Sequence, residues 1–272
     1  MSVYVDPAIA RAESPALAAY ERLAPVYDLF TAGYDHPSWL DALEALAREH
    51  GLGGRRLLDI GCGTGKSFLP MLARGYEVSA CDVSPAMVEL AREKVDAAGA
   101  HADLFVADMR ALPPTAPADL ITCLDDAVNY LVEPEDLTAA LAGMAGALAP
   151  GGLAVFDVNT LVTYRSSFAS DFALDGPGSF LCWRGKADAL FAPGEVAEAA
   201  IELFEEEEDG RWRRSVSRHV QRHHPREEVE AAIEAAGLEL AAVRGQARGA
   251  RLQLHADELE HSKLVYLARK ES

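Results

Sequence analysis

Between residues 56 and 158, short apolar runs alternate with amphipathic segments, and this alternation is the main pattern in the chain. The apolar runs predict buried strands, and the segments with helical spacing predict helices between them. Strands that alternate with helices form a parallel sheet with right-handed crossovers, whose ligands bind at the carboxyl ends of the strands. The predicted strands span residues 56–60, 76–81, 104–107, 118–124 and 153–158, and the predicted helices span residues 66–73, 85–98 and 134–148.

The pattern changes on both sides of this region. Residues 1–13 have the composition of a loose tail, whereas residues 14–50 show the spacing of amphipathic helices. After residue 159 the strand-helix alternation stops, and residues 161–175 are mixed and loop-like, with room for a short helix. From residue 179 the apolar positions alternate as in half-buried strands, and Asp209-Gly210 is a typical hairpin turn. The strands predicted here span residues 179–189, 195–207 and 211–223, and a helix at 225–236 and strands at 238–244 and 263–268 complete the chain.

A glycine-rich turn follows the first predicted strand. Gly61, Gly63 and Gly65 occupy alternate positions, and Asp59 lies just before them. Glycines allow positive φ angles and a close approach of the backbone to a ligand. A nicotinamide dinucleotide site requires glycine at position 66, where this chain has lysine, and a P-loop requires glycine at position 60, where it has isoleucine. The spacing therefore disfavours both of these phosphate-binding motifs.

Acidic residues end the next two predicted strands. Asp82 ends the second strand, where a carboxylate accepts hydrogen bonds from the ribose hydroxyls of a nucleoside. The third strand ends in Ala107-Asp108-Met109, and Pro150-Gly151-Gly152 precedes the fifth. In this order the motifs resemble those of class I S-adenosylmethionine (SAM) dependent methyltransferases of the small-molecule type, including amino-sugar N-methyltransferases and glycine N-methyltransferase-like enzymes.

This resemblance implies an α/β fold with a Rossmann-like seven-stranded sheet and an antiparallel β lid inserted after strand five. It divides the chain into an N-terminal helical cover (1–50), a SAM-binding core (51–160), an inserted sheet that acts as the substrate lid (161–224) and a C-terminal completion of the core sheet (225–272). In the family, the N-terminal segment closes over the methionine part of SAM. Packing of aromatic residues on the core is the alternative explanation for Tyr27 in that segment.

The resemblance also implies SAM as the cofactor. In the family, the carboxylate that corresponds to Asp108 accepts a hydrogen bond from the adenine amino group. The residues predicted to form the cofactor site are Tyr27, Asp59, Gly61, Cys62, Gly63, Asp82, Val83, Met87, Asp108, Met109 and Leu124.

Polar residues after the fourth strand are candidates for the site of the methyl acceptor. Asp126, Asn129 and Tyr130 lie where related enzymes bind the acceptor, and Asn159 ends the fifth strand on the same side. An Asx turn is the alternative explanation for Asp126 or Asn129 alone. The predicted catalytic residues are Tyr27, Asp126, Tyr130 and His223, and the predicted substrate-binding residues are Asp126, Asn129, Tyr130 and Asn159.

Charge and cysteine content narrow the choice of partners. The chain has 25 basic and 43 acidic residues, a formal net charge of −18, and no continuous basic stripe, so we expect neither nucleic acid nor an anionic membrane as a partner. Its four cysteines form no Cys-x-x-Cys pair, so neither a metal site nor a disulfide framework is predicted. The absence of a signal peptide in this sequence leads us to expect a cytoplasmic protein.

The sequence therefore predicts an enzyme that transfers a methyl group from SAM to a nitrogen or oxygen of a small molecule, such as a natural-product or sugar intermediate. Nitrogen is slightly favoured over oxygen. Two alternatives stay open: a SAM-fold enzyme with cyclisation, lyase or pericyclic chemistry, and a non-catalytic SAM-binding protein. A homodimer also stays open.

Overall fold

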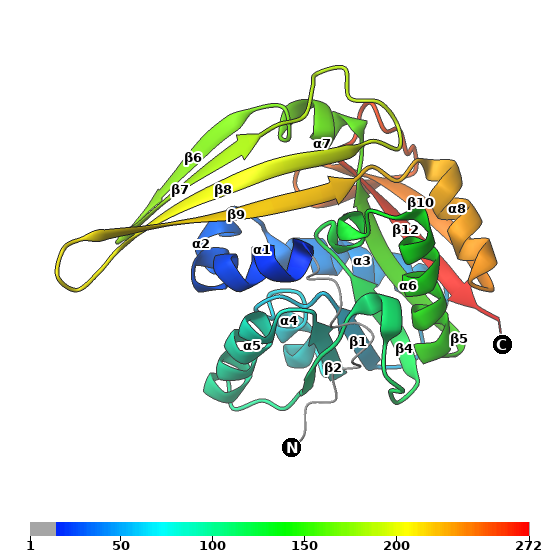
Figure 1. Ribbon diagram of the computed structural model, residues 1–272. Coiled ribbons are helices and arrows are strands. Elements are labelled where there is room, and N and C mark those ends of the chain that lie inside the picture. The colour runs from blue at the N-terminus through cyan, green and yellow to red at the C-terminus, as the bar shows by residue number, and fades with distance from the viewer. Residues whose placement is uncertain (1–14, 272) are drawn as a thin grey trace.

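The computed structural model describes residues 15–271, which form two β-sheets with helices packed on and between them (Figure 1). The tail predicted for residues 1–13 lies outside the described residues. The larger sheet has eight strands in the order β11-β10-β12-β5-β4-β1-β2-β3. These strands are β1 (Arg56–Ile60), β2 (Glu77–Asp82), β3 (Asp103–Val106), β4 (Ala118–Cys123), β5 (Leu148–Asn159), β10 (Leu238–Ala247), β11 (Arg251–Gln253) and β12 (Lys263–Lys270).

The direction of these strands follows the connections between them. Strands β1 to β5 are parallel, as expected where helices connect consecutive strands, and β10 and β12 join antiparallel at the edge next to β5. The predicted α/β sheet is therefore confirmed, but its count of seven strands is wrong. The short strand β11 pairs with β10 and adds an eighth strand, within a polar stretch that has no clear periodicity.

Helices cover both faces of this sheet, as two apolar clusters show. On β1, Leu58 and Ile60 pack against α6 (Pro134–Ala147) and α8 (Arg226–Ala235), because alternate side chains of a strand point to the same face. Leu57 points to the opposite face, towards the second cluster. The helices of that second face are α3 (His36–Glu49), α4 (Leu69–Ala73) and α5 (Pro85–Ala97).

The smaller sheet is antiparallel and has the order β6-β7-β8-β9. Its strands are β6 (Asp171–Gly176), β7 (Ser179–Gly185), β8 (Val196–Glu206) and β9 (Trp212–Arg222), and α7 (Leu161–Ser166) precedes them. The inserted antiparallel sheet is confirmed, with one strand more than the three predicted. Strand β6 was missed because it is short and carries acidic and glycine residues that are typical of loops.

Two short helices and a 3-10 turn lie between the two sheets (Figure 1). They are α1 (Pro15–Leu23), η2 (Ala24–Val26) and α2 (Tyr27–Phe30), and the 3-10 turn contains Pro25, which interrupts the predicted helix. The carboxylate of Glu21 accepts hydrogen bonds from Ser84 Oγ (2.6 Å) and Ala86 N (3.0 Å) at the start of α5. On the other side, Arg22 donates to the carbonyl oxygen of Val216 on β9 (2.5 Å). The helix α1 is therefore tied to both sheets.

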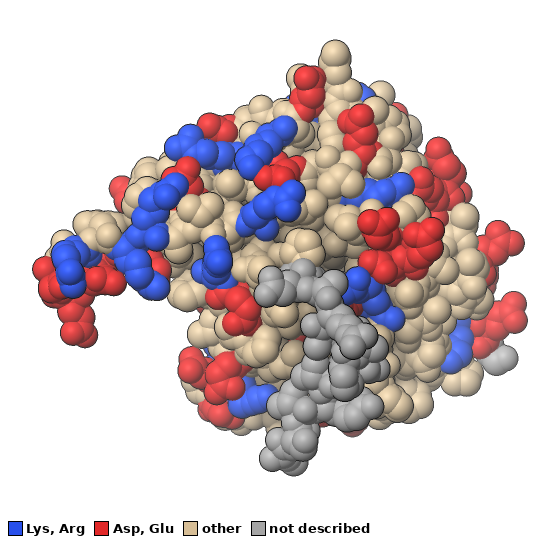
Figure 2. Space-filling view, in the orientation of Figure 1, with Lys and Arg blue, Asp and Glu red and all other residues tan. Residues whose placement is uncertain are grey.

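Charges on the exposed face of the smaller sheet occur in pairs (Figure 2). Arg184 and Arg214 both contact Glu202, at 2.7 and 2.8 Å, and Arg218 contacts Glu198 at 2.5 Å. These arginines therefore lie beside carboxylates. Among the helices of residues 15–271, none combines the length and the hydropathy that crossing a membrane requires.

The packing of β7 against the chain after α7 gives a stability prediction. A Cβ atom on Gly185 would lie 2.2 Å from the carbonyl oxygen of Phe168, whereas one on Gly146 in α6 would meet no heavy atom within 4 Å. We expect Gly185→Ala to destabilise the protein by about 1–3 kcal/mol, and Gly146→Ala to stabilise it by about 0.5–1 kcal/mol through helix propensity. Thermal unfolding of both variants tests this, and equal melting temperatures would contradict it.

Candidate functional site

Two adjoining cavities lie beyond the carboxyl ends of the parallel strands. The glycine-turn cavity is lined by Gly61, Gly63, Asp82 and Asp108, among others. The aromatic cavity, in which eight of the 20 lining residues are Phe, Tyr or Trp, has a volume of about 250 Å³. The two cavities share four lining residues: Tyr20, Tyr27, Asp125 and Tyr130.

The turn after β1 places backbone at the wall of the glycine-turn cavity. The amides of Gly61 and Cys62 both donate to the carbonyl oxygen of Cys81, at 2.8 and 3.0 Å. Gly61 and Gly63 have φ angles of +70° and +51°, which other residues adopt only with strain. A Cβ atom on Gly61 would also lie 3.0 Å from the Cβ atom of Ala127. Glycine is therefore needed at this position for both conformation and space.

Asp82 connects this turn to the next strand. Its Oδ2 accepts from the amide of Gly63 (2.9 Å), and its Oδ1 accepts from the amide of Ser84 (2.9 Å). Burial raises the pKa of Asp82, although these amide bonds oppose the shift. The carboxylate lines the cavity, where its remaining lone pairs face a ligand.

Asp59 does not line the glycine-turn cavity and instead holds the turn in place through hydrogen bonds to its side chain. Its side chain is buried and accepts hydrogen bonds from Thr122 Oγ1 (2.6 Å) and from Ser67 Oγ. Burial raises its pKa to about 7, against the two hydroxyl bonds. Met87 is fully buried and does not line the cavity either. The prediction that Asp59 and Met87 contact the cofactor therefore does not agree with their positions.

Asp108 also lines the glycine-turn cavity and is paired with Arg110, which was not among the predicted site residues. Arg110 Nη2 lies 2.6 Å from Asp108 Oδ2, and Arg110 Nη1 lies 3.0 Å from Asp136 Oδ2. These hydrogen bonds to Asp108 raise the pKa of Arg110. All three residues line the glycine-turn cavity. The predicted residues that also line it are Cys62, Val83, Met109 and Leu124.

The N-terminal helices close the space between the cavities. The ring of Tyr27 lies over the turn, since a Cβ atom on Gly63 would be 3.3 Å from it. Tyr20 packs edge-on against Tyr27, with 6.1 Å between ring centroids, and it lines both cavities as well. Asp28 holds this segment by accepting a hydrogen bond from Thr64 Oγ1 (2.6 Å). Tyr27 therefore lines the cavities as well as packing against other aromatic residues.

Two consecutive aspartates after β4 adopt a left-handed conformation. Asp125 and Asp126 have φ angles of 56° and 55°, which cost about 1–3 kcal/mol each. The buried carboxylate of Asp157 accepts from the amides of both, at 2.9 and 2.6 Å. These bonds hold the strained turn, which aims the two aspartate side chains at the cavities.

A single lysine faces three carboxylates at this turn. Lys263 Nζ lies 2.8 Å from Asp126 Oδ1, 3.0 Å from Asp157 Oδ1 and 3.9 Å from Asp125 Oδ1. Burial lowers the pKa of Lys263, but the three carboxylates outweigh burial and raise it well above its usual value. His36 Nε2 lies 2.9 Å from the other oxygen of Asp125. The three carboxylates outnumber the single lysine ammonium, so this cluster keeps an excess of negative charge.

The aromatic cavity has an apolar wall and a polar wall. Trp183 stacks against Phe30 and Phe172, with centroid distances of 6.3 and 5.7 Å and interplanar angles of 15° and 12°. On the polar wall, Gln221 Nε2 donates to Asp126 Oδ2 at 2.6 Å. The other polar residues that line this cavity include Tyr34, Tyr130, Asn159, His219, Gln246 and Lys263.

Two predicted site residues, the substrate-binding Asn129 and the catalytic His223, line neither cavity. Asn129 is buried, donates to the carbonyl oxygen of Arg222 (2.9 Å) and accepts from the amide of Asn159 (2.9 Å), so it joins β9 to β5. His223 follows the last residue of β9, and its Nδ1 accepts from the amide of Gly194 (3.2 Å). The alternation along β9 does not extend to His223, and His219 is the histidine of β9 that reaches the cavity.

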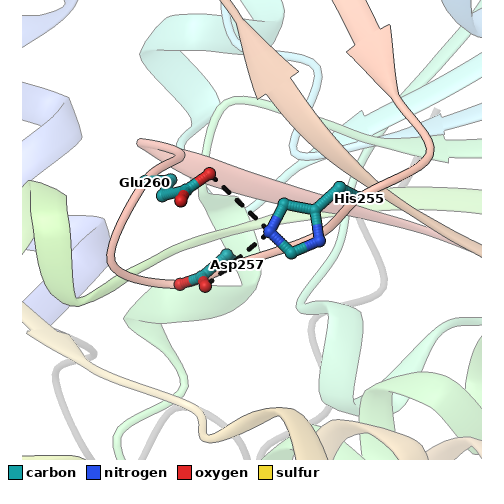
Figure 3. Close-up of side chains that lie close together, drawn as sticks. All are labelled: His255, Asp257 and Glu260. Atoms are coloured by element: carbon teal, nitrogen blue, oxygen red, sulfur yellow. Dashed lines mark ion pairs between the residues drawn. The ribbon is translucent and has the colours of Figure 1, made fainter.

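A third group of polar side chains lies on the loop between β11 and β12 (Figure 3). His255 Nε2 lies 3.8 Å from Asp257 Oδ2 and 3.6 Å from Glu260 Oε2, and these side chains are exposed. They line neither cavity, and their mutual pairing accounts for their arrangement.

Comparison with known proteins agrees with this geometry. Residues 57–152 match the family described as "Methyltransferase domain". The dTDP-4-amino-2,3,4,6-tetradeoxy-D-glucose N,N-dimethyltransferase of Saccharopolyspora spinosa is 32% identical over 136 residues, which are 49% of this chain and 53% of that relative. The chain thus spans about half the length of this curated relative.

Solved structures resemble the whole chain. A SAM-dependent methyltransferase of Clostridium acetobutylicum superposes with a TM-score of 0.78 at 24% identity, over 93% of this chain and 99% of that one. The sugar N-methyltransferase KedS8 of Streptoalloteichus sp. gives a TM-score of 0.71 at 22% identity, over 100% and 97%. These structures confirm the predicted fold, and the domain match and the curated methyltransferase relative confirm the predicted enzyme class.

The buried Asp59 predicts a pH dependence of stability. An unfolded aspartate has a pKa of about 4, so between about pH 4 and pH 7 the folded chain keeps a proton that the unfolded chain has lost. The contribution of Asp59 to stability therefore falls as pH rises through this window and is constant above it. We expect Asp59→Asn to gain about 1 kcal/mol relative to the wild type per pH unit between pH 5 and pH 7.

Urea denaturation at pH 5, 6, 7 and 8 measures this difference. Asp96→Asn, a change at an exposed position on α5, serves as the control with no such dependence. A constant difference between the wild type and Asp59→Asn across this range would refute the explanation.

Proposed function

We propose that this protein, a SAM-dependent methyltransferase, transfers the methyl group of SAM to an amine nitrogen of a small molecule. The observation that carries the proposal is the turn at the junction of the two cavities, where Asp125, Asp126 and Asp157 share the single charge of Lys263. Such excess negative charge favours a cationic amine over a neutral or anionic acceptor. Oxygen is the alternative acceptor atom.

The residues of the glycine-turn cavity fit SAM. Asp82 has lone pairs for the ribose hydroxyls, and Asp108 has one for the adenine amino group. The glycine turn leaves room where a Cβ atom would collide, and Val83, Met109 and Leu124 supply apolar walls. Tyr27 lies near the junction, where we place the methionine end. When bound, SAM supplies a methyl group on a sulfonium whose leaving group is neutral.

Asp126 is placed to handle the acceptor nitrogen. An ammonium group must lose a proton before its lone pair becomes a nucleophile, and a carboxylate within hydrogen-bond reach can take that proton. Asp126 lines the aromatic cavity, and Lys263 and Gln221 fix both of its oxygens. Tyr130 lies beside it on the same wall. These contacts orient the amine towards the glycine-turn cavity, and Asp126 takes up the proton and passes it on to solvent, so that it is again a carboxylate when the neutral amine reacts.

The aromatic cavity suits an acceptor that is a ring of modest size. The parallel stack of Trp183 with Phe30 and Phe172 offers a flat apolar face, and the opposite wall offers hydrogen-bond partners. A natural-product or sugar intermediate that carries an amine combines both features. The sugar N-methyltransferases among the similar proteins support this choice.

Two tyrosines border the junction of the cavities. Tyr20 and Tyr27 come from the N-terminal helices and cover the space between the two cavities, which favours transfer to the acceptor over side reactions. We retain the expectations that the acceptor is not a nucleic acid and that the protein acts in the cytoplasm. A homodimer stays open. We also retain the alternatives of non-methylating chemistry and of SAM binding without catalysis.

The affinity for SAM tests the proposed placement of the cofactor in the glycine-turn cavity. Asp82→Ala removes the carboxylate that accepts from the ribose and holds the turn, so SAM binding should weaken by about 1.5–3 kcal/mol, roughly 10- to 150-fold. Asp96→Ala on the exposed face of α5 should bind SAM normally. Calorimetric titration measures both. Unchanged affinity in Asp82→Ala would refute the placement of SAM.

Turnover with amine and hydroxyl substrates tests the proposed methyl acceptor and the role of Asp126. We expect S-adenosylhomocysteine to form with cyclohexylamine, trans-4-aminocyclohexanol or glucosamine, and much less with cyclohexanol, trans-1,4-cyclohexanediol or glucose. Asp126→Asn should lower turnover of the best amine at least tenfold and change SAM affinity by less than about twofold, because Asp126 acts on the acceptor. Asp209→Asn at the exposed hairpin turn is the control.

Three outcomes would contradict this assignment. Release of methylthioadenosine in place of S-adenosylhomocysteine indicates lyase chemistry. Normal turnover in Asp126→Asn makes the aspartate turn structural. Loss of SAM binding in step with activity places Asp126 in the cofactor site.

A further inference from the structure

We propose that His219 is a positioning residue that makes Tyr130 a hydrogen-bond acceptor towards the methyl acceptor, so that the site selects a primary amine. This inference rests on the proposed function. It assigns to His219 a role that it exerts through Tyr130, and it predicts an order of preference among amine substrates.

His219 bridges two hydroxyl groups at the wall of the aromatic cavity. Its Nδ1 lies 2.9 Å from the hydroxyl oxygen of Tyr130, and its Nε2 lies 3.1 Å from Ser217 Oγ. The side chain lines the cavity, yet the residue is only 1% exposed. Edge-on contact with Tyr20, at 5.7 Å between centroids, and tilted contact with Trp183, at 6.2 Å, hold the ring in place.

The chemistry of these groups sets the direction of both hydrogen bonds. Burial lowers the pKa of His219 to about 4, so the ring is neutral near pH 7 and carries one N–H. A phenol is a stronger acid than an alkyl hydroxyl, so Tyr130 donates to Nδ1 and the Nε2–H donates to Ser217. Burial also raises the pKa of Tyr130, which keeps its proton.

Tyr130 therefore offers only lone pairs to the cavity. A phenol hydroxyl has one hydrogen, and Tyr130 donates it in the hydrogen bond to His219 Nδ1. The neighbouring carboxylate of Asp126 is also an acceptor, because Lys263 and Gln221 are its donors. Tyr130 and Asp126 therefore both present acceptor atoms to the aromatic cavity, which Tyr20, Gln221 and Lys263 also line.

A neutral primary amine matches this pair. It donates one N–H to Asp126 and one to Tyr130, and its lone pair then points away from both acceptors. A hydroxyl or a secondary amine has a single hydrogen to donate and leaves one acceptor unpaired, which costs affinity for the reactive orientation. We therefore expect the first methyl transfer to a primary amine to be faster than a second transfer to the same nitrogen.

Loss of the histidine reverses the role of Tyr130. In His219→Phe the hydroxyl can rotate and donate to the amine lone pair, which opposes transfer. In His219→Asn the amide oxygen lies near the position of Nδ1 and can still accept from Tyr130. The first variant should therefore be impaired and the second largely restored.

The experiment compares His219→Phe, His219→Asn, Tyr130→Phe and the double variant His219→Phe/Tyr130→Phe with the wild type. The substrate is whichever of cyclohexylamine, trans-4-aminocyclohexanol and glucosamine the wild type methylates fastest. We expect His219→Phe to lower kcat at least tenfold with SAM affinity within about twofold, and His219→Asn to stay within about threefold of the wild type. Tyr130→Phe should add less than about twofold in the His219→Phe background.

A second measurement uses the same amine and its N-methyl derivative. The wild type should prefer the primary amine by about tenfold or more in kcat/KM, and His219→Phe should lose most of this preference. Thermal unfolding of each variant separates this effect from loss of fold.

Independent effects of the two substitutions, failure of His219→Asn to restore turnover, or an unchanged preference in a folded His219→Phe would each overturn the inference. These results differ from failure of the proposed function, in which the wild type methylates none of the three amines. In that case the inference falls with the function on which it rests.

Discussion

The buried contact between Lys263 and Asp157 holds the centre of this protein together. Asp157 accepts the amides of two strained aspartates, and Lys263 balances part of the charge that the three carboxylates bring into a dry environment. Removing one partner from such a buried cluster costs about 3–5 kcal/mol, because the remaining charge loses its compensation. The residual negative charge faces both cavities, and on it rests our proposal that the methyl acceptor is a cationic amine.

A second constraint comes from the N-terminal helices. Glu21 binds the start of α5, and Arg22 binds β9, so α1 fixes the distance between the two sheets. Tyr20 and Tyr27 thereby reach the boundary between the cavities, where each contributes to both. The same N-terminal segment therefore borders both the glycine-turn cavity and the aromatic cavity, so a ligand in either cavity contacts the same aromatic side chains.

Local patterns explain which parts of this protein the sequence could predict. The strand, glycine turn and helix around Gly61 and Gly63 depend on residues that are close in the chain, and this region was placed correctly to within a few residues. The short strands β6 and β11 were missed, because their pairing with neighbours outweighs weak local propensity. Asn129 and His223 were assigned to the acceptor site because they are polar and near strand ends, but tertiary contacts use them to join elements.

The sequence by itself determined the enzyme class, the α/β core and most of the glycine-turn cavity, since these follow from periodicity, turn chemistry and acids at strand ends. Only the tertiary structure decided which residues line the aromatic cavity. Lys263 and Asp157 are 106 residues apart, and Tyr130 and His219 are 89 residues apart. No local pattern links such pairs, because they meet only when β12 adds next to β5 and when β9 folds back over the end of β4. The charge balance at the aspartate turn and the direction of the Tyr130 hydroxyl bond are properties of that packing.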